Sequence, residues 1–392
     1  MTKDWNTRTK LVHEGIRRSQ YGEMAEALFL TQGFVYPSAE VAEERFLHSG
    51  PDEFIYARYG NPTTRMFEDR IAAIEGTEDA FACASGMAAV NAALSCQVKS
   101  GDHIVAARQM FGSCLYVLKL LQGFGVEVTL VDGVQLAQWE AAMQPNTKIC
   151  FFESVSNPGL EVIDVKGVAD IAHAHGAKLV VDNVFASPVF SKAVELGADY
   201  IVYSTTKHID GGGRALGGVV CGDREFIRGP LETFAKHTGA AMSPYHAWLH
   251  LSGMQTLDLR VRAQAESAAK IAAATEGHPA LIRAIYPGLP SHPQHDLAMA
   301  QMGSGGTMVA LDLKGGKEAA FRFLNALEVV KISNNLGDAK SIATHPATTT
   351  HKNLTEEERA EIKITPGMVR ISIGIEDGND LVKDIVGALD AV

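Results

Sequence analysis

Seven short apolar runs between about residue 79 and residue 222 constrain the fold of this chain more than any other feature. The runs read DAFACA, DHIVAA, VEVTLVD, KICFFE, KLVVDN, DYIVYS and GGVVCG, and segments of helical character separate them. Short apolar runs bordered by Gly, Asp, Asn or Ser are typical of buried strands in a mostly parallel sheet. We therefore predict one large α/β domain in this part of the chain.

The rest of the chain adds an N-terminal arm and a second domain. The first fifty residues carry few periodic signals, and we interpret them as an arm that packs on a partner subunit. The stretch TRMFEDRIAAIEG has apolar residues at helical spacing and predicts a helix that ends at Gly76. A long helical stretch from about Ala247 leads to further strands, including GTMVALDL and MVRISIGIE. The expected domains are an arm over 1–55, a large domain over 56–250 and a smaller C-terminal α/β domain over 251–392.

The composition and net charge of the chain indicate which kinds of binding partner to expect. Of the 392 residues 46% are hydrophobic, which is ample for a large core. The net charge is -11 and no basic run interrupts it, so nucleic acid and anionic membranes are not expected as partners. No apolar run reaches the roughly 18 residues of a spanning helix, and no signal-peptide pattern opens the chain. The five scattered cysteines indicate reduced thiols, so we expect a cytoplasmic protein with no disulfide and no metal site, acting on small molecules.

Polar residues follow two of the predicted strands. In DYIVYSTTKHIDGGG, Ser204 and Thr206 are two apart, so an extended strand would point both hydroxyls the same way, with Lys207 at its carboxyl end. Asp182 ends the run KLVVDN in the same manner. Ligands of open α/β sheets bind at this edge, so we expect these side chains to lie close together.

A third sequence feature, a candidate phosphate-binding turn, indicates which cofactor these residues could bind. Gly86 and Met87 follow a strand and open a helix of small residues, where free N–H groups can hold a phosphate. A lone lysine after a strand is usually a solvated charge, and a strand-end Asp is usually a turn residue. Together with a phosphate seat they indicate pyridoxal 5'-phosphate, with Lys207 as the covalent attachment point and Asp182 keeping the pyridine nitrogen protonated. The glycines at 211–213 and 217–218 match no nucleotide motif and predict close backbone approach and a flexible turn.

Several motifs resemble one known family over nearly the whole chain. They are YARYGNPT, SGMAA, ESVSNPG, VVDNVFASP, YSTTKHIDGG, THPATTTH and VRISIGIED. The chain resembles the Cys/Met metabolism group of pyridoxal-phosphate enzymes, also called cystathionine γ-synthase-like. This resemblance implies the aspartate aminotransferase type of fold (fold type I), with a mostly parallel sheet in the large domain. It also implies a homo-oligomer, commonly a tetramer built from dimers that share active sites.

The resemblance assigns roles to individual residues. For the cofactor it implies contacts from Gly86, Met87, Phe111, Asn157, Asp182, Ser204, Thr206 and Lys207, and from Tyr56 and Arg58 reaching into the neighbouring subunit. For the substrate it implies that Arg370 pairs with the α-carboxylate and that Ser333 supplies a backbone contact beside it. Without the resemblance, Arg370 would be interpreted as a surface charge on an amphipathic strand.

Within the group the chain is most similar to the enzymes that act on homoserine esters, through FGSC at 111–114 and SNNLGDAKS at 333–341. The implied reaction converts O-succinyl-L-homoserine and sulfide to L-homocysteine and succinate. Use of the acetyl ester, or of cysteine as in a cystathionine γ-synthase, stays open. A cystathionine or methionine γ-lyase is a further alternative, and a non-catalytic α/β binding protein is the alternative from another class.

One position departs from the family. The family usually has a tyrosine over the cofactor ring where this chain has Phe111. Phenylalanine keeps the stacking face but has no proton to give. A carboxylate leaving group needs little acid help whereas a thiol needs more, so Phe111 favours replacement on an ester over thiol elimination.

Overall fold

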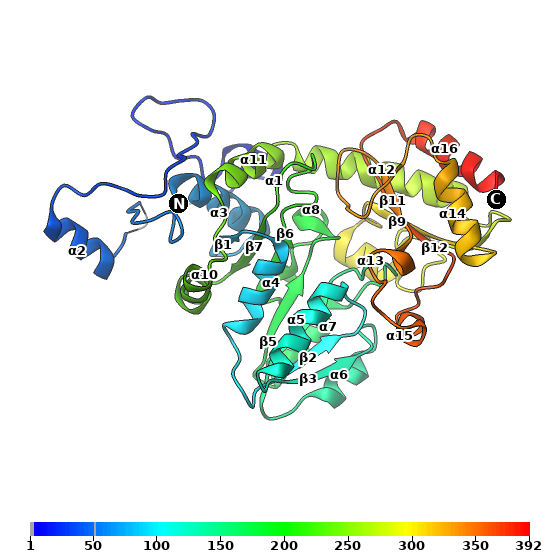
Figure 1. Ribbon diagram of the computed structural model, residues 1–392, viewed down its shortest axis with the longest axis horizontal. Coiled ribbons are helices and arrows are strands. Elements are labelled where there is room, and N and C mark those ends of the chain that lie inside the picture. The colour runs from blue at the N-terminus through cyan, green and yellow to red at the C-terminus, as the bar shows by residue number, and fades with distance from the viewer. Residues whose placement is uncertain (1–3, 51) are drawn as a thin grey trace.

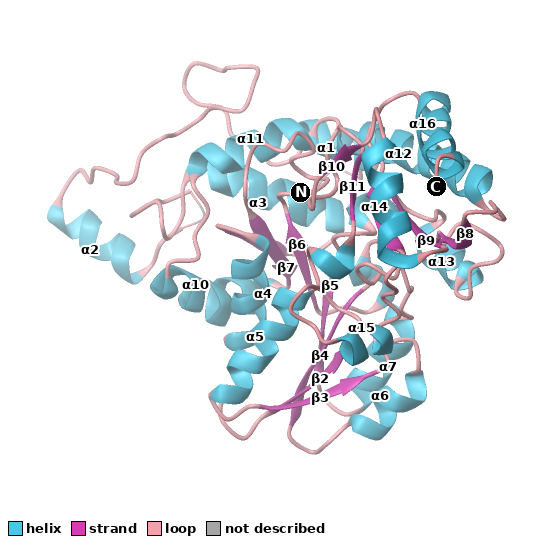
Figure 2. Cartoon of the chain, turned by 45° about the vertical axis from the view of Figure 1, so that its right-hand side comes forward, coloured by secondary structure: helices cyan, strands magenta, loops and turns pink. Residues whose placement is uncertain are grey.

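The structure is a computed structural model that describes residues 4–50 and 52–392. Two sheets organise it, a seven-stranded sheet in the order β1-β7-β6-β5-β4-β2-β3 and a five-stranded sheet in the order β10-β11-β12-β9-β8. In the large sheet only β7 runs antiparallel to its neighbours. Helices lie on both sides of this sheet (Figure 2). The fold is α/β, as the sequence and the family resemblance predict.

All seven predicted runs form strands of the large sheet. Its strands are β1 Asp79–Cys83, β2 His103–Ala107, β3 Glu127–Val131, β4 Thr147–Glu153, β5 Lys178–Asp182, β6 Tyr200–Ser204 and β7 Gly218–Gly222. The small sheet consists of β8 Leu281–Ile285, β9 Met308–Leu313, β10 Lys331–Ile332, β11 Ile342–Thr344 and β12 Met368–Ser372. The two later runs, GTMVALDL and MVRISIGIE, supply β9 and β12.

The helices follow the same order along the chain. Before and around the large sheet they are α1 Thr7–His13, α2 Ala39–Leu47, α3 Pro62–Glu75, α4 Gly86–Ser95, α5 Gly112–Gly123, α6 Leu136–Ala142, α7 Val165–Ala174, α8 Ser187–Phe190, α9 Arg224–Phe226 and α10 Glu232–Thr238. The later helices are α11 Pro244–Met254, α12 Leu257–Thr275, α13 His295–Met302, α14 Gly316–Ala326, α15 Glu356–Glu361 and α16 Gly378–Asp390. The predicted helix before the sheet is α3, and it ends at Gly76, which has a φ of 94°. Positive φ suits glycine because it has no Cβ.

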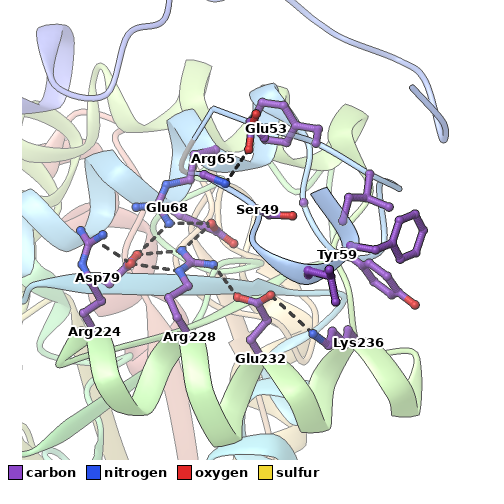
Figure 3. A pocket seen from close by; sticks show the side chains of 16 residues that line it. Ser49, Glu53, Tyr59, Arg65, Glu68, Asp79, Arg224, Arg228, Glu232 and Lys236 are labelled. Carbon is purple, nitrogen blue, oxygen red and sulfur yellow. Dashed lines mark hydrogen bonds and ion pairs between the residues drawn. The ribbon is translucent and has the colours of Figure 1, made fainter. Parts of the chain in front are cut away.

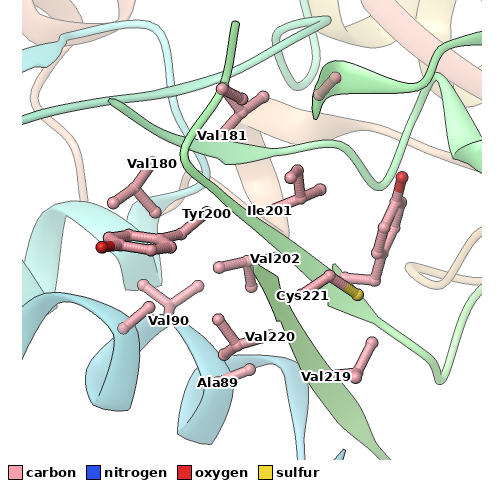
Figure 4. Packing of buried hydrophobic residues seen from close by; sticks show 14 of the residues in the cluster. Ala89, Val90, Val180, Val181, Tyr200, Ile201, Val202, Val219, Val220 and Cys221 are labelled. Carbon is pink, nitrogen blue, oxygen red and sulfur yellow. The ribbon is translucent and has the colours of Figure 1, made fainter. Parts of the chain in front are cut away.

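Side-chain alternation explains how the large sheet is covered. Figure 4 shows Val202 of β6 facing Val90 of α4. The next residue of β6, Tyr203, points the other way and donates its hydroxyl proton to Glu75 of α3. Because successive strand residues face opposite sides, α3 and α4 cover opposite faces of the sheet. The strands are apolar on both faces for this reason, and the uninterrupted apolar runs reflect it.

The long helix α12 joins the two cores (Figure 1). Val261 of α12 belongs to the core of the large sheet, and Ala268, two turns later, belongs to the core of the small sheet. A third apolar cluster brings Phe185, from the end of the large sheet, against Met308 and Met368 of the small one. The proposed boundary near residue 250 lies within α11, and the change of core occurs further on, within α12.

The N-terminal segment extends away from the body, with α2 at its far end (Figure 1). It contains two short helices, α1 and α2, where few periodic signals occur in the sequence. Large apolar side chains on it are exposed: Tyr21, Met24, Leu30, Val35, Phe46 and Leu47. In the described part of the chain no helix has the length and apolar character needed to cross a membrane.

Candidate active site

A cavity of about 520 Å³ lies where the carboxyl ends of β4, β5 and β6 meet the small domain. Nine of the predicted site residues line it: Gly86, Met87, Phe111, Asn157, Asp182, Ser204, Thr206, Lys207 and Arg370. Six elements or their ends, from α4 to β12, supply them. The strand-end argument therefore located this cavity correctly.

Lys207 occupies the turn that follows β6. Its Nζ donates a hydrogen bond to Oδ1 of Asn335, which lies on the loop between β10 and β11. Burial, together with the nearby charge of Arg370, lowers the pKa of Lys207 to about 8, although Asp182 opposes this shift. An amine with this pKa is partly neutral near pH 7, so it can act as a nucleophile or a base.

The glycines around Lys207 let the two domains approach each other. A Cβ on Gly337 would lie 2.6 Å from the backbone nitrogen of His208, and one on Gly213 would lie 2.4 Å from Oδ2 of Asp338. Both glycines also have positive φ, at +73° and +66°. The loop that carries Asn335 therefore lies close against the Lys207 turn. The predicted close backbone approach is confirmed at Gly218, where a Cβ would lie 2.2 Å from the backbone oxygen of Ser85.

The phosphate seat predicted at the start of α4 has the geometry for that role. Ser85 caps the helix by accepting from the N–H of Ala88, while the N–H groups of Gly86 and Met87 begin the helix and have no acceptor within it. A Cβ on Gly86 would lie 2.6 Å from Cβ of Ser204, so only glycine allows this approach. Ser204 thereby lies beside the helix N-terminus.

Thr206 reaches the same cavity for a different reason from the one predicted. Strand β6 ends at Ser204, so strand alternation does not extend to Thr206. Its hydroxyl instead accepts from the N–H of Gly217 at 3.1 Å, and it lines the cavity from the turn. The two hydroxyls share the cavity through the turn and not through the strand.

Two carboxylates line the cavity side by side. Asp182 of β5 pairs in register with Glu153 of β4, and Sγ of Cys114 lies with their oxygens in a group within 4.8 Å. Burial raises the pKa of Asp182 to about 7, against the opposing effects of the Val184 N–H and Lys207. Burial and the charge of Asp182 raise the pKa of Glu153 as well. A cation between these groups, such as a protonated ring nitrogen, would be stabilised.

Sequence reasoning missed Glu153 and Asn335. Glu153 ends the run KICFFE just as Asp182 ends KLVVDN, so the same strand-end signal was present. Asn335 lies in the motif SNNLGDAKS, from which Ser333 was selected. Ser333 does not line the cavity, whereas Asn334 and Asn335 do. The N–H of Ser333 donates to Ala343 as part of the small sheet.

Arg370 is buried and lines the cavity from the small domain. It lies on β12, donates to Oδ1 of Asn157 at 2.7 Å and donates to the backbone oxygens of Asn334 and Asn335 at 3.1 Å each. Its Nε has no hydrogen-bond partner. Burial lowers the pKa of Arg370 to about 10, with Glu153 opposing the shift. A buried cation with an unpartnered N–H is suited to a carboxylate ligand.

Tyr56 and Arg58 lie outside this cavity. The Arg58 guanidinium lies over the rings of Tyr56 and Tyr59, and it donates to the backbone oxygen of Lys236. Tyr56 is 41% exposed. Within one chain, these two residues therefore do not reach the Lys207 cavity.

A second cavity, of about 600 Å³, lies beside the base of the arm (Figure 3). Its cations are already paired with carboxylates of the same chain. Arg228 pairs with Glu68, Asp79 and Glu232, Arg224 with Asp79, and Lys236 with Glu232. Burial raises the pKa of Glu68 to about 8. Because these cations have carboxyl partners in the same chain, this cavity offers no counterpart to the Lys207 site.

The Lys207 cavity fits pyridoxal 5'-phosphate. It combines a primary amine, a carboxylate for the ring nitrogen, an aromatic ring at Phe111 and a phosphate seat at the start of α4. The trio of Cys114, Glu153 and Asp182 is also the one group of metal-type ligands among the described residues. Both oxygens of Glu153 already accept backbone N–H groups. The trio also lines the same cavity as Lys207, so these residues fit pyridoxal 5'-phosphate better than a metal ion.

Comparisons with known proteins agree with this interpretation. A protein of Mycobacterium tuberculosis named O-succinylhomoserine sulfhydrylase is 50% identical over 96% of this chain and 94% of its own length. An L-methionine gamma-lyase of Porphyromonas gingivalis is 39% identical over 98% of this chain and 97% of its own length. The solved structure of a putative O-acetylhomoserine (thiol)-lyase from Campylobacter jejuni contains a pyridoxyl-lysine phosphate. It superposes with a TM-score of 0.94 at 28% identity, covering 98% of this chain and 100% of the other.

The family model described as Cys/Met metabolism PLP-dependent enzyme matches residues 8–390. This span includes both sheets and the whole Lys207 cavity. The chain belongs to the Cys/Met metabolism family of PLP-dependent enzymes.

Proposed function

We propose that the chain catalyses a γ-replacement in which O-succinyl-L-homoserine and sulfide give L-homocysteine and succinate. In this reaction the Cγ–O bond to succinate breaks and a Cγ–S bond forms. The observation that carries the proposal is one cavity that holds both the Lys207 amine and the unpartnered N–H of Arg370. The similarity to a relative named for this activity supports the choice of substrate.

Some residues of the cavity would bind the cofactor, and others would bind the substrate. Bound pyridoxal 5'-phosphate would supply an electron sink next to the substrate α-carbon. Lys207 would hold the cofactor and, as a free amine, would remove the proton from that carbon with its Nζ. Asp182 would keep the ring nitrogen protonated, and Arg370 would bind the substrate carboxylate. In place of Ser333, we assign the contact beside Arg370 to Asn334 and Asn335, whose backbone oxygens touch it.

The phosphate contacts complete the proposed set. We assign them to the N–H groups of Gly86 and Met87 and to the hydroxyls of Ser204 and Thr206, all of which line the cavity. Asn157 would contact the ring hydroxyl while its Oδ1 accepts from Arg370. Phe111 would stack on the ring, and its lack of an acidic proton favours a carboxylate leaving group over a thiol.

A second copy of the chain completes the site in this proposal. Tyr56 and Arg58 do not reach the cavity of their own chain, and the arm that precedes them exposes several large apolar side chains. An arginine is well suited to a phosphate dianion of a neighbouring subunit. We therefore propose a homo-oligomer, a tetramer of dimers, with the arm over 1–55 at the dimer interface. The five free cysteines support a location in the reducing cytoplasm.

The test is a panel of substrates given to the purified holoenzyme. O-Succinyl- and O-acetylhomoserine are each supplied with sulfide or with cysteine, and products are identified by mass spectrometry. The proposal predicts homocysteine from the succinyl ester and sulfide as the fastest combination. Preference for the acetyl ester or for cysteine would reassign the substrate, and a colourless protein without activity would favour a binding function instead.

A further inference from the structure

Glu153 connects two parts of the cofactor cavity that are far apart in the sequence. Its Oε1 accepts the backbone N–H of Phe111 at 2.7 Å, and its Oε2 accepts the backbone N–H of Asn157 at 3.1 Å. Phe111 caps the start of α5, whereas Asn157 lies in the turn after β4. One side chain therefore holds the two backbone segments that face the cofactor ring.

A carboxyl group can satisfy both donors. Each of its two oxygens can accept a hydrogen bond, whereas an amide would point its NH₂ group at one of the two N–H groups. A buried donor without an acceptor is destabilising. Gln or Asn at this position would therefore leave either Phe111 or Asn157 unheld.

Glu153 occupies a position where a carboxyl group costs stability, so a glutamate without a function would not be expected there. Glu153 is buried, and its register partner is another carboxylate, that of Asp182. Burial and this like charge raise the pKa of Glu153. An apolar side chain would avoid both penalties at the end of a strand that is otherwise apolar. Strongly perturbed groups in a cavity are candidates for a functional role.

We propose that Glu153 is a positioning residue that fixes the ring-facing Phe111 and the Asn157–Arg370 pair as one unit. The second half of this unit follows from the contact between Oδ1 of Asn157 and Nη1 of Arg370 at 2.7 Å. If the Asn157 backbone moves, the Oδ1 atom that accepts from Arg370 moves with it. If the Phe111 backbone moves, the phenyl ring that faces the cofactor moves with it. Glu153 therefore sets the spacing between the cofactor plane and the substrate carboxylate.

The test compares Glu153→Gln with Glu153→Asp in the holoenzyme. Gln removes the charge and one acceptor, while Asp keeps the charge but is one methylene shorter. The readouts are the visible circular dichroism of the bound cofactor, its dissociation constant, and KM and kcat for the acylated substrate. We expect both variants to lower the dichroism and weaken cofactor binding by roughly 10- to 100-fold, the effect of losing a buried hydrogen-bond partner. KM should rise more than kcat falls.

Glu68→Gln is the matched control. Glu68 is also a buried glutamate, and it accepts the backbone N–H of Ala82 at 2.9 Å, but it lines the second cavity. This control should lose stability without changing the cofactor signal. A wild-type signal and affinity in folded Glu153→Gln, or equal changes in the control, would overturn the proposal. If Glu153→Asp behaves as wild type while Gln does not, the length of the side chain has no effect, so Glu153 does not set the spacing, which also overturns the proposal.

The inference rests on the proposed function only for the identity of the substrate. Dichroism and cofactor affinity report on Phe111 and Asn157 whichever ester is used. If the substrate panel fails while these signals change as expected, the positioning role stands and the substrate assignment falls.

Discussion

Nζ of Lys207 donates to the side-chain oxygen of Asn335, a residue 128 positions further along the chain. The backbone oxygen of the same Asn335 accepts from Arg370 at 3.1 Å. One residue of the small domain thus contacts both the proposed base and the proposed carboxylate-binding cation. It is placed to hold the free amine of Lys207 whenever that amine is not attached to the cofactor.

Asn335→Ala should therefore lower kcat by about 10-fold, the scale of one hydrogen bond to a charged or reacting group, with a smaller change in KM. The backbone contact to Arg370 persists in this variant. Asn334→Ala is the control, because Asn334 lines the same cavity and offers Arg370 the same kind of backbone oxygen. Steady-state kinetics with the acylated substrate decides between them, and equal kcat losses in both variants would contradict the role of the Asn335 side chain.

The lowered pKa of Lys207 predicts how the cofactor-free protein takes up its cofactor. Burial brings this pKa to about 8, and only the neutral amine attacks an aldehyde. Incorporation should therefore become faster with rising pH, by roughly tenfold per unit well below the pKa, and level off above about pH 8. Stopped-flow absorbance of cofactor uptake measures this. A rate that still rises steeply up to pH 10 would show that the amine is not desolvated.

Asp182→Asn should reduce turnover more than cofactor occupancy. Asparagine keeps the size of the side chain but cannot hold a positive charge on the ring nitrogen. The loss of one such preorganised partner lowers kcat by about 100- to 1,000-fold. Occupancy is read from absorbance after dialysis, and kcat from fully loaded enzyme. Unchanged turnover in a loaded variant would assign Asp182 a structural role.

Phe111→Tyr tests why this chain departs from its family. The substitution keeps the ring face and restores an acidic proton that can reach a departing thiol. General acid help is worth roughly 10² to 10⁴ in rate, and we expect a smaller gain here because the pocket is shaped for phenylalanine. The measurement is the kcat/KM ratio of cystathionine elimination to sulfhydrylation in wild type and variant. An unchanged ratio would make Phe111 a packing residue without influence on reaction type.

The sequence alone predicted the large sheet well, because fully buried parallel strands leave a local signal. All seven apolar runs became strands, and their carboxyl ends placed Asp182 and Lys207 in one cavity. The same signal also marked Glu153, which ends β4 and was not predicted as a site residue. Thr206 reached the cavity although the strand ended before it, so the prediction was right for the wrong geometric reason.

Contacts between the domains could not be predicted from local pattern. The alternation of β12 does not reveal that Arg370 is buried, because burial depends on the loop of Asn334 and Asn335 folding over it. Within SNNLGDAKS the spacing gave no reason to prefer Asn335 to Ser333. Gly337 and Gly213 allow that loop to approach the Lys207 turn, and their close contacts exist only in the folded chain.

The central claim is that this cavity performs replacement on an ester and not elimination. The most direct measurement supplies wild-type holoenzyme with O-succinyl-L-homoserine and saturating sulfide and quantifies homocysteine, succinate and 2-oxobutanoate in one reaction. The account predicts homocysteine and succinate in equal amounts, with 2-oxobutanoate as a minor product. Succinate accompanied mainly by 2-oxobutanoate, or no succinate while methionine or cystathionine is cleaved efficiently, would contradict it.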